Sequence, residues 1–304
     1  MEFTSIEEVI EKLENADYIP SREIATVVFL ASATGKPILV EGPAGAGKTE
    51  LARAIASSLN RQKIRLQCYE GLDEAKALYE WEYAKQLLYT QMIKEKINDL
   101  IAGAGSIAEA VERIADQEDA FFSERFLLER PLLRAITSDE PVVLLIDEID
   151  KADPEFEAFL LELLSEFQVT IPELGLKKAR RIPMVVLTSN NYRDMSDALK
   201  RRCLHLYIDY PEPELEKRII KLKLPGIEKR LADHLVEAVN KIRELDMKKR
   251  PCISETIDWA RALAALQFKE LSGQAVFDTL NVICKNRSDA GLVRDSIERI
   301  LPRQ

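Results

Sequence analysis

Apolar and polar positions in the first two thirds of the chain alternate between a strand-like and a helix-like period. Short apolar runs predict strands at residues 37–42, 141–150, 184–190 and 204–210, and alternation of polar and apolar residues predicts a fifth at 63–68. Helical spacing of the apolar residues predicts helices at residues 5–16, 22–33, 48–59 and 154–167. Strands that alternate with helices in this way are typical of an α/β fold with a parallel, helix-covered sheet.

The pattern changes beyond the segment YPEPE, where every apolar run has helical spacing. The expected helices occupy residues 213–222, 227–245, 254–269, 274–285 and 289–301. We therefore predict two domains with a boundary near Pro211: an α/β domain over 1–210 and a small all-α domain over 211–304.

Two stretches of the predicted α/β domain exceed what the alternating pattern needs, and we interpret them as inserts at about 70–130 and 169–181. In the first insert, residues 73–105 read as one long helix and residues 106–115 as another. The segment DQEDAFFSERFLLERPLLRAI reads as an acidic turn and a further amphipathic helix. Several aromatic side chains here are spaced for helix packing, in a core or at an interface: Tyr69, Tyr79, Trp81, Tyr83 and Tyr89.

The second insert is predicted to be a hairpin with four cations in five positions, Lys177, Lys178, Arg180 and Arg181. Two interpretations of these cations stay open. They belong either to a loop that contacts a substrate, for example in a pore, or to a solvated hairpin that touches a neighbouring subunit.

Composition and charge narrow the class of protein. The net charge of −9 over 304 residues argues against a broad nucleic-acid surface. Apolar runs are too short for a membrane span, and the acidic, amphipathic start is unlike a signal peptide, so we expect a cytoplasmic protein. The four cysteines lie far apart without a C-x-x-C pair, which favours buried free thiols over a zinc site or disulfides.

The segment EGPAGAGKTE follows the first predicted strand and opens a helix, the setting in which a phosphate-binding loop works. Its glycines let backbone N–H groups surround phosphate oxygens, and the helix N-terminus adds partial positive charge. Lys48 is expected to reach the β- and γ-phosphates of ATP, and Thr49 to ligate Mg²⁺. The predicted nucleotide-binding residues are Gly42, Pro43, Ala44, Gly45, Ala46, Gly47, Lys48, Thr49, Glu50 and Asp147.

A second pair of candidate residues, Asp147 and Glu148, ends the predicted strand VVLLID. Ligands of open α/β sheets bind at this carboxyl edge. Asp147 is expected to hold the Mg²⁺ hydration shell together with Thr49, and Glu148 to polarise the attacking water. A water-activating glutamate favours ATP hydrolysis over phosphate transfer to a small molecule. Asp150 and Lys151 are expected to form a turn and cap before the helix at Pro154, without a chemical role.

Four segments in this order resemble the AAA+ ATPases: GPAGAGKT, LLIDEID, LTSNN and ALKRRC. Within them the chain is similar to the MoxR group, and more closely to its CoxD-like branch. That closer likeness lies in QCYEGLDEAKALYEWEY, LLERPLLRAI, LTSNNYRDMSDALKRRCLHLYIDYPEPE and SETIDWARAL. The resemblance implies a five-stranded parallel sheet of order 5-1-4-3-2 followed by a helical lid.

The resemblance also implies a function and partners. Such proteins assemble as hexameric rings with ATP between subunits and act as chaperone-like remodellers, often with a partner that carries a von Willebrand factor A domain. CoxD-like members are associated with the maturation of molybdenum hydroxylases such as carbon monoxide dehydrogenase. Two alternatives from other classes are a DNA-acting AAA+ motor or loader, and a scaffold that binds ATP without turning it over.

Carried onto this sequence, the resemblance places Asn190 as the sensor-1 residue that holds the attacking water. Asn191 is then a turn residue. Arg202 matches the arginine finger, with Arg201 as the alternative. Because a finger acts on the neighbouring subunit's nucleotide, the pair Asn190 and Arg202 predicts an oligomer.

One position departs from the family pattern. The register that usually carries the sensor-2 arginine holds Thr256 here. Arg261, further along the same predicted helix, is a possible substitute or else a residue of a solvated helix face.

Overall fold

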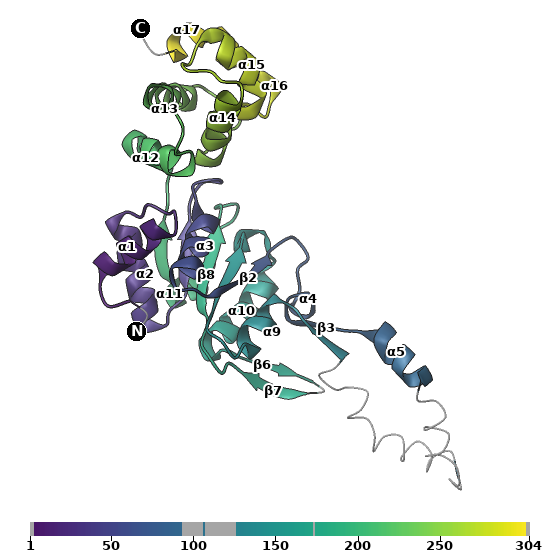
Figure 1. Cartoon of the computed structure of the whole chain (residues 1–304). Coiled ribbons are helices and arrows are strands. Elements are labelled where there is room, and N and C mark those ends of the chain that lie inside the picture. The colour runs from purple at the N-terminus through teal and green to yellow at the C-terminus, as the bar shows by residue number, and fades with distance from the viewer. Residues whose placement is uncertain (1–2, 93–105, 107–125, 173, 302–304) are drawn as a thin grey trace.

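A computed structural model describes residues 3–92, 106, 126–172 and 174–301 (Figure 1). It contains a central sheet of five strands, which are β1 (Ile38–Glu41), β2 (Gln62–Gln67), β5 (Val142–Asp147), β8 (Met184–Ser189) and β9 (Leu204–Tyr207). All pairings in this sheet are parallel. The predicted α/β fold with a five-stranded parallel sheet is therefore confirmed.

The strand order in the sheet is β2-β5-β8-β1-β9. If only these five strands are counted along the chain, the order from the β9 edge is 5-1-4-3-2. The labels differ from this count because β3, β4, β6 and β7 form two small antiparallel sheets outside the central one. The sequence pattern did not predict strands β3 and β4, whereas β6 and β7 form the predicted hairpin.

Alternate residues of the three inner strands, β1, β5 and β8, belong to two different cores. Ile38 and Val40 pack in one core, whereas Leu39 between them packs in the other. Helices α1 (Ile6–Asn15), α2 (Arg22–Thr34) and α3 (Lys48–Ser58) cover the first face. The second face is covered by α9 (Pro131–Thr137), α10 (Pro154–Glu166) and α11 (Asp197–Arg202) (Figure 1). Burial on both faces explains why these strands read as continuous apolar runs.

The predicted helices on these faces begin and end where side chains satisfy the backbone. Ser5 caps α1 by accepting a hydrogen bond from the Glu8 amide at 3.1 Å. Ser21 caps α2 in the same way through the Ile24 amide, also at 3.1 Å. Helix α2 ends at Gly35, which adopts a left-handed conformation.

The first insert corrects the sequence prediction. Residues 73–105 do not form one helix, because the described part contains α4 (Glu74–Leu78), strand β3 (Tyr79–Trp81) and α5 (Tyr83–Met92). Strand β3 pairs antiparallel with β4 (Leu127–Glu129). The alternation in YEWEY fits a strand, but its partner is about fifty residues away, so local spacing did not indicate the pairing.

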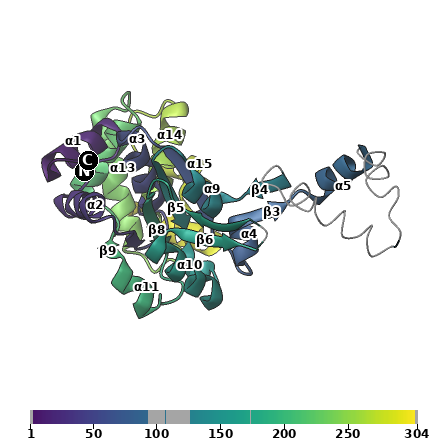
Figure 2. The same ribbon diagram turned by 90° about the horizontal axis from the view of Figure 1, so that it is seen from below.

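Other parts of this insert also differ from the prediction. The expected amphipathic helix before residue 137 is instead β4 followed by the shorter α9, which starts at Pro131 in its first turn. Except for Ser106, the predicted helix 106–115 lies outside the described residues. Helix α5 extends away from the central sheet, as the view from below shows (Figure 2).

The second insert is a hairpin, as predicted, made of β6 (Gln168–Ile171) and β7 (Gly175–Lys178). Of its predicted cations, Arg180 forms an exposed ion pair with Asp139. The two interpretations of these cations stay as predictions.

The last part of the described chain is helical, with α12 (Pro213–Lys223), α13 (Lys229–Arg243), α14 (Ile253–Ala265), α15 (Gly273–Ile283), α16 (Arg287–Asp295) and α17 (Ile297–Ile300). The predicted helix 289–301 is therefore two helices, interrupted at Ser296, whose backbone leaves the helical region. These helices share one apolar core, drawn from residues 220–300, and lie above the sheet in Figure 1. Among the described residues, no helix combines the length and apolar content needed to cross a bilayer.

A buried ion pair lies where the helical part begins. Arg243 donates to both carboxylate oxygens of Glu216, at 2.7 and 2.8 Å, and Glu216 is fully buried. The same guanidinium donates to the Pro251 carbonyl at 2.8 Å and lies 5.3 Å from the ring centre of Tyr210. Arg243 thus joins α12, α13 and the segments that precede α12 and α14.

We expect Arg243→Met to lower the free energy of unfolding by about 3–5 kcal/mol, because it leaves the Glu216 carboxylate buried without its cation. Denaturant unfolding followed by circular dichroism measures this loss. The matched control is Arg22→Met, since Arg22 pairs with Glu7 at the exposed surface and its removal should leave stability nearly unchanged. Equal effects of the two substitutions would contradict the prediction.

Candidate active site

The loop between β1 and α3 carries the predicted phosphate-binding residues at the carboxyl edge of the sheet. Two of its glycines are required by close contacts. A Cβ at Gly42 would lie 2.0 Å from the Ile208 carbonyl oxygen, and one at Gly45 would lie 2.2 Å from Cys252 Sγ. Both glycines also have positive φ angles, +145° and +75°. The loop therefore packs directly against the end of β9 and the start of α14.

Lys48 begins α3 and is only 5% exposed. Its ammonium donates to the Gly42 and Pro43 carbonyls, both at 2.7 Å, so the cation lies within the loop itself. Burial lowers the pKa of Lys48, and three nearby carboxylates, that of Asp150 most strongly, oppose this shift.

Thr49 and Asp147 meet across the sheet edge. Thr49 Oγ1 donates to Asp147 Oδ1 at 3.0 Å, and Thr188 Oγ1 donates to the same oxygen at 2.5 Å. Arg65 donates to the other oxygen, Oδ2, from Nε at 3.0 Å and from Nη2 at 2.6 Å. A hydroxyl and a carboxylate are the oxygen donors that Mg²⁺ prefers, so the predicted pair Thr49 and Asp147 fits this metal.

Glu148 follows β5 with φ +57°, a left-handed conformation that turns it away from the line of the strand. Its Oε1 accepts from Asn190 Nδ2 at 3.2 Å. Its Oε2 accepts from Gln67 Nε2 at 2.8 Å and from Lys151 Nζ at 2.6 Å. The structure thus brings together Glu148 and Asn190, two predicted residues from neighbouring strands.

Asp150 has a larger part in this arrangement than the predicted turn. It lies in a 3₁₀ turn and is 1% exposed. Its Oδ2 accepts from the backbone amides of Asn190 at 3.0 Å and Tyr192 at 2.9 Å. Asp150 therefore holds the loop after β8 in place, and Asn191 between these two residues has φ +60°, as a turn residue does.

The phosphate-loop residues and the two carboxylates surround one cavity of about 300 Å³. Its lining consists of Ala44, Gly45, Gly47, Lys48, Thr49, Glu50, Asp147, Glu148, Thr188, Asn190 and Ser254. Ser254 is the contribution of helix α14 to this polar cavity. The cavity is therefore bounded by the sheet edge, the loop and the helical part.

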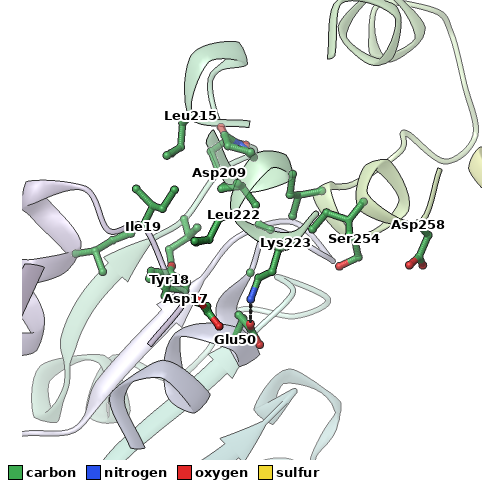
Figure 3. Close-up of a pocket in the computed structure, with 18 of the residues that line it drawn as sticks. Asp17, Tyr18, Ile19, Glu50, Asp209, Leu215, Leu222, Lys223, Ser254 and Asp258 are labelled. Atoms are coloured by element: carbon green, nitrogen blue, oxygen red, sulfur yellow. Dashed lines mark hydrogen bonds and ion pairs between the residues drawn. The ribbon is translucent and has the colours of Figure 1, made fainter. Parts of the chain in front are cut away.

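A second cavity of about 340 Å³ shares Gly47, Glu50 and Ser254 with the first. Its walls come from both parts of the chain, including Tyr18, Ile19, Ile208, Leu222 and Ile257 (Figure 3). Lys223 of α12 donates to Glu50 Oε1 at 2.8 Å across this space. Hydrogen bonds from Arg53 and then from Lys223 lower the pKa of Glu50 to about 2, so it stays ionised.

Comparison with known families adds to this geometry. A family profile described as "AAA ATPase domain" matches residues 21–175, more than half of the 304 residues. The chain belongs to the AAA ATPase family. The matched range of this AAA ATPase includes the phosphate loop and both strand-end carboxylates.

Individual relatives of this AAA ATPase are distant. An uncharacterized protein of Staphylococcus haemolyticus is 28% identical over 237 residues, which are 76% of each chain. An uncharacterized protein of Staphylococcus epidermidis is 26% identical, also over 237 residues, which are again 76% of each chain. Among solved structures, the RuvB Holliday junction branch migration motor of Thermotoga maritima is 19% identical, with a TM-score of 0.48, over 94% of this chain and 75% of that one. At this level of similarity the last comparison does not bear on function.

Other predicted residues of the AAA ATPase lie outside its polar cavity. Arg201 and Arg202 occupy the last turn of α11, are exposed, and line neither of the two cavities. Within the described ranges, neither guanidinium forms an ion pair or hydrogen bond. The structure therefore does not separate these two candidates for the finger.

The orientation of α14 places the two candidates for the sensor-2 position on different faces. Thr256 is fully buried, and its hydroxyl donates to the Cys252 carbonyl at 3.1 Å, away from the cavities. Arg261 lies on the other face and lines the second cavity, where it pairs with Asp258 at 3.2 Å. Of the two candidates, only Arg261 is adjacent to the site.

Sequence reasoning missed several polar residues of the site, namely Arg65, Gln67, Thr188, Lys151 and Lys223. A signal existed for two of them. Arg65 and Gln67 alternate with buried residues in the predicted strand 63–68, so both point to one face at its carboxyl end. The strand order implied by the resemblance placed this strand beside 141–150, but it did not indicate which side chains meet there.

Proposed function

We propose that this AAA ATPase binds ATP with Mg²⁺ and hydrolyses it at the cavity between the phosphate loop and β5. The observation that carries the proposal is the meeting of Lys48, Thr49, Asp147, Glu148 and Asn190 around one cavity of about 300 Å³. These residues come from three separate segments, and each has the chemistry that one part of ATP hydrolysis needs.

The residues divide between binding and hydrolysis. Loop amides and the Lys48 ammonium bind the phosphates, and Thr49 with Asp147 hold the metal ion. Mg²⁺ when bound neutralises developing charge on the phosphate oxygens. Glu148 takes a proton from the attacking water, and Asn190, fixed by its contacts to Asp150 and Glu148, orients that water.

The second cavity is suited to the nucleoside. Its apolar walls lie directly beside the phosphate loop, and residues of α12 and α14 close one side. A nucleoside placed there would contact both the α/β part and the helical part. The division at Pro211 into a nucleotide-binding domain and a helical lid is part of this proposal.

The wider role that we propose is that of a cytoplasmic, MoxR-type remodeller of the CoxD-like branch. It would work as an oligomer, in a hexameric ring, with a von Willebrand factor A partner and a client enzyme such as a molybdenum hydroxylase. The exposed position of Arg202, away from its own chain's cavity, supports action on a neighbouring subunit. The net charge of −9 disfavours the DNA-acting alternative.

Lys48→Ala tests the core of the proposal. We expect it to weaken the binding of a fluorescent ATP analogue by about thirtyfold to a hundredfold, because a buried ammonium–phosphate contact is lost. Fluorescence titration of the purified protein measures the affinity, and phosphate release measures hydrolysis. Lys36→Ala, at an exposed position before β1, is the control and should behave as the wild type. Unchanged affinity in Lys48→Ala would overturn the proposed site.

A further inference from the structure

Arg65 makes a contact that the proposed roles do not use. It lies on β2 opposite Leu145 of β5, two residues before the pair Gln67 and Asp147. From there its side chain reaches the carboxyl edge of the sheet, where Nε and Nη2 both donate to Asp147 Oδ2, at 3.0 and 2.6 Å. Charge-assisted contacts of this kind are among the stronger hydrogen bonds in proteins.

The contact balances a buried charge. Asp147 is 2% exposed, and among the described residues its other oxygen accepts only from the neutral hydroxyls of Thr49 and Thr188. A buried carboxylate needs a cation nearby to remain ionised at low energetic cost. Lys48 is near enough to act electrostatically, but its ammonium donates to loop carbonyls. Arg65 is therefore the cation in direct contact with Asp147.

We propose that Arg65 competes with Mg²⁺ for Asp147, so that metal–nucleotide binds by displacing this guanidinium. The inference rests on the proposed function, because it assumes that Asp147 helps to hold the metal. Both cations need the same buried carboxylate, Arg65 through Oδ2 and the metal on the Oδ1 side where Thr49 lies, and two positive charges on one carboxylate repel each other. The Arg65 side chain is 49% exposed, so it can move into water without breaking the sheet.

Displacement of Arg65 also affects Glu148 through Gln67. The same Nη2 donates to Gln67 Oε1, and Gln67 Nε2 donates to Glu148 Oε2 at 2.8 Å. When Arg65 leaves, Gln67 loses a partner that fixes its amide, and one contact on Glu148 becomes weaker. Binding of the metal ion is thereby coupled to the mobility of the Glu148 side chain, which activates water.

The test compares the affinity for a fluorescent ATP analogue in excess Mg²⁺ with that in EDTA. The quantity of interest is the ratio of the dissociation constant in EDTA to that in Mg²⁺. In Arg65→Met the metal meets no competitor, so we expect this ratio to rise about threefold to tenfold above the wild type. Lys63→Met is the matched control, since Lys63 lies two residues earlier on the same strand face. Its ratio should equal that of the wild type.

Other outcomes separate the hypotheses. An unchanged ratio in Arg65→Met would overturn the competition and leave the contact as a structural ion pair. A lower ratio would also overturn it, because Arg65 would then stay and assist the bound metal–nucleotide. If wild type and Lys63→Met both fail to bind the analogue in either buffer, the proposed function itself fails.

A second measurement avoids the variant in case it does not fold. Wild-type protein is treated with phenylglyoxal, and modification of Arg65 is followed by mass spectrometry. We expect the modification rate to rise at least about twofold with Mg²⁺ and ATP compared with ATP in EDTA, because a displaced guanidinium is more accessible. An equal or lower rate would contradict displacement. Arg22, whose ion pair is remote from the site, serves as the internal reference.

Discussion

Glu148→Gln should lower the rate of ATP hydrolysis by about a thousandfold and leave ATP affinity nearly unchanged. The amide keeps the size of the glutamate but cannot accept a proton from water. The amino group of the new side chain would also face hydrogen-bond donors in either orientation, because Glu148 accepts from Asn190 at one oxygen and from Gln67 and Lys151 at the other. Single-turnover hydrolysis and fluorescence titration measure the two quantities separately.

The control for this substitution is Glu140→Gln, in the exposed segment just before β5. It removes one glutamate charge from the same part of the chain and should retain the wild-type rate. A loss of less than about tenfold in Glu148→Gln would exclude it as the general base. A parallel loss of affinity would instead point to a role in binding.

Glu148→Gln also provides a way to identify the partner proteins. Because Glu148→Gln should bind ATP without hydrolysing it, an assembly that requires bound ATP should persist during affinity purification in the presence of ATP. Comparison with Lys48→Ala, which should not hold ATP, identifies the proteins that depend on the nucleotide. A von Willebrand factor A protein or a molybdenum hydroxylase among them would support the CoxD-like role. Identical sets from both variants would contradict nucleotide-dependent remodelling.

The sequence predicted those parts of the site whose residues are adjacent to one another in the chain. The phosphate loop needs a strand, glycines and a lysine in immediate succession, and Asp147 with Glu148 follow directly from one apolar run. The inner strands β1, β5 and β8 were predictable because burial on both faces favours apolar residues at most positions, whereas β2 was predictable from its alternation of polar and apolar residues. In these cases the local pattern and the tertiary environment impose the same choice of residue.

What remained unpredicted depends on pairing between distant segments. Strand β3 exists because β4 lies beside it, and the Arg65 contact exists because β2 neighbours β5. Asp150 looks like a turn residue until the loop after β8 is placed next to it. Each of these features depends on which side chains of a distant segment lie nearby, and neither the pattern of one segment nor the expected strand order contains that information.

Helix α14 illustrates a subtler limit. Its existence followed from periodicity, but its rotation about its own axis did not. Ser254, Ile257, Asp258 and Arg261 line the second cavity, with the spacing of one helix face. Thr256 lies on the opposite face, inside the helical core. The register of the family motif therefore assigned the sensor-2 position to Thr256, a residue that faces away from the site.

Arg202→Ala should lower the hydrolysis rate by about a thousandfold at protein concentrations where subunits associate, because a finger neutralises charge that develops in the transition state. Affinity for ATP should remain that of the wild type, since Arg202 does not line its own chain's cavities. Wild-type activity per subunit should itself rise with concentration as subunits associate. Activity that stays constant on dilution, down to concentrations where sedimentation shows monomers, would contradict a finger supplied by a neighbour.

Substitutions in the same helical turn identify the finger. Lys200→Ala changes the charge equally and should leave the rate unchanged. Arg201→Ala separates the two candidates, because only the true finger produces the large loss. If both arginine variants lose activity to the same extent, the turn acts as a unit and neither residue alone is the finger.

Mixing two inactive variants decides whether the arginine acts between subunits. Arg202→Ala retains Glu148, and Glu148→Gln retains Arg202. In a mixed assembly, some cavities combine an intact Glu148 with an intact Arg202 from the neighbour, so the mixture should regain a substantial part of the wild-type activity. If Arg202 served its own chain's nucleotide, every cavity would lack one of the two groups and the mixture would stay inactive. Recovered activity would therefore locate the active site between two copies of this chain.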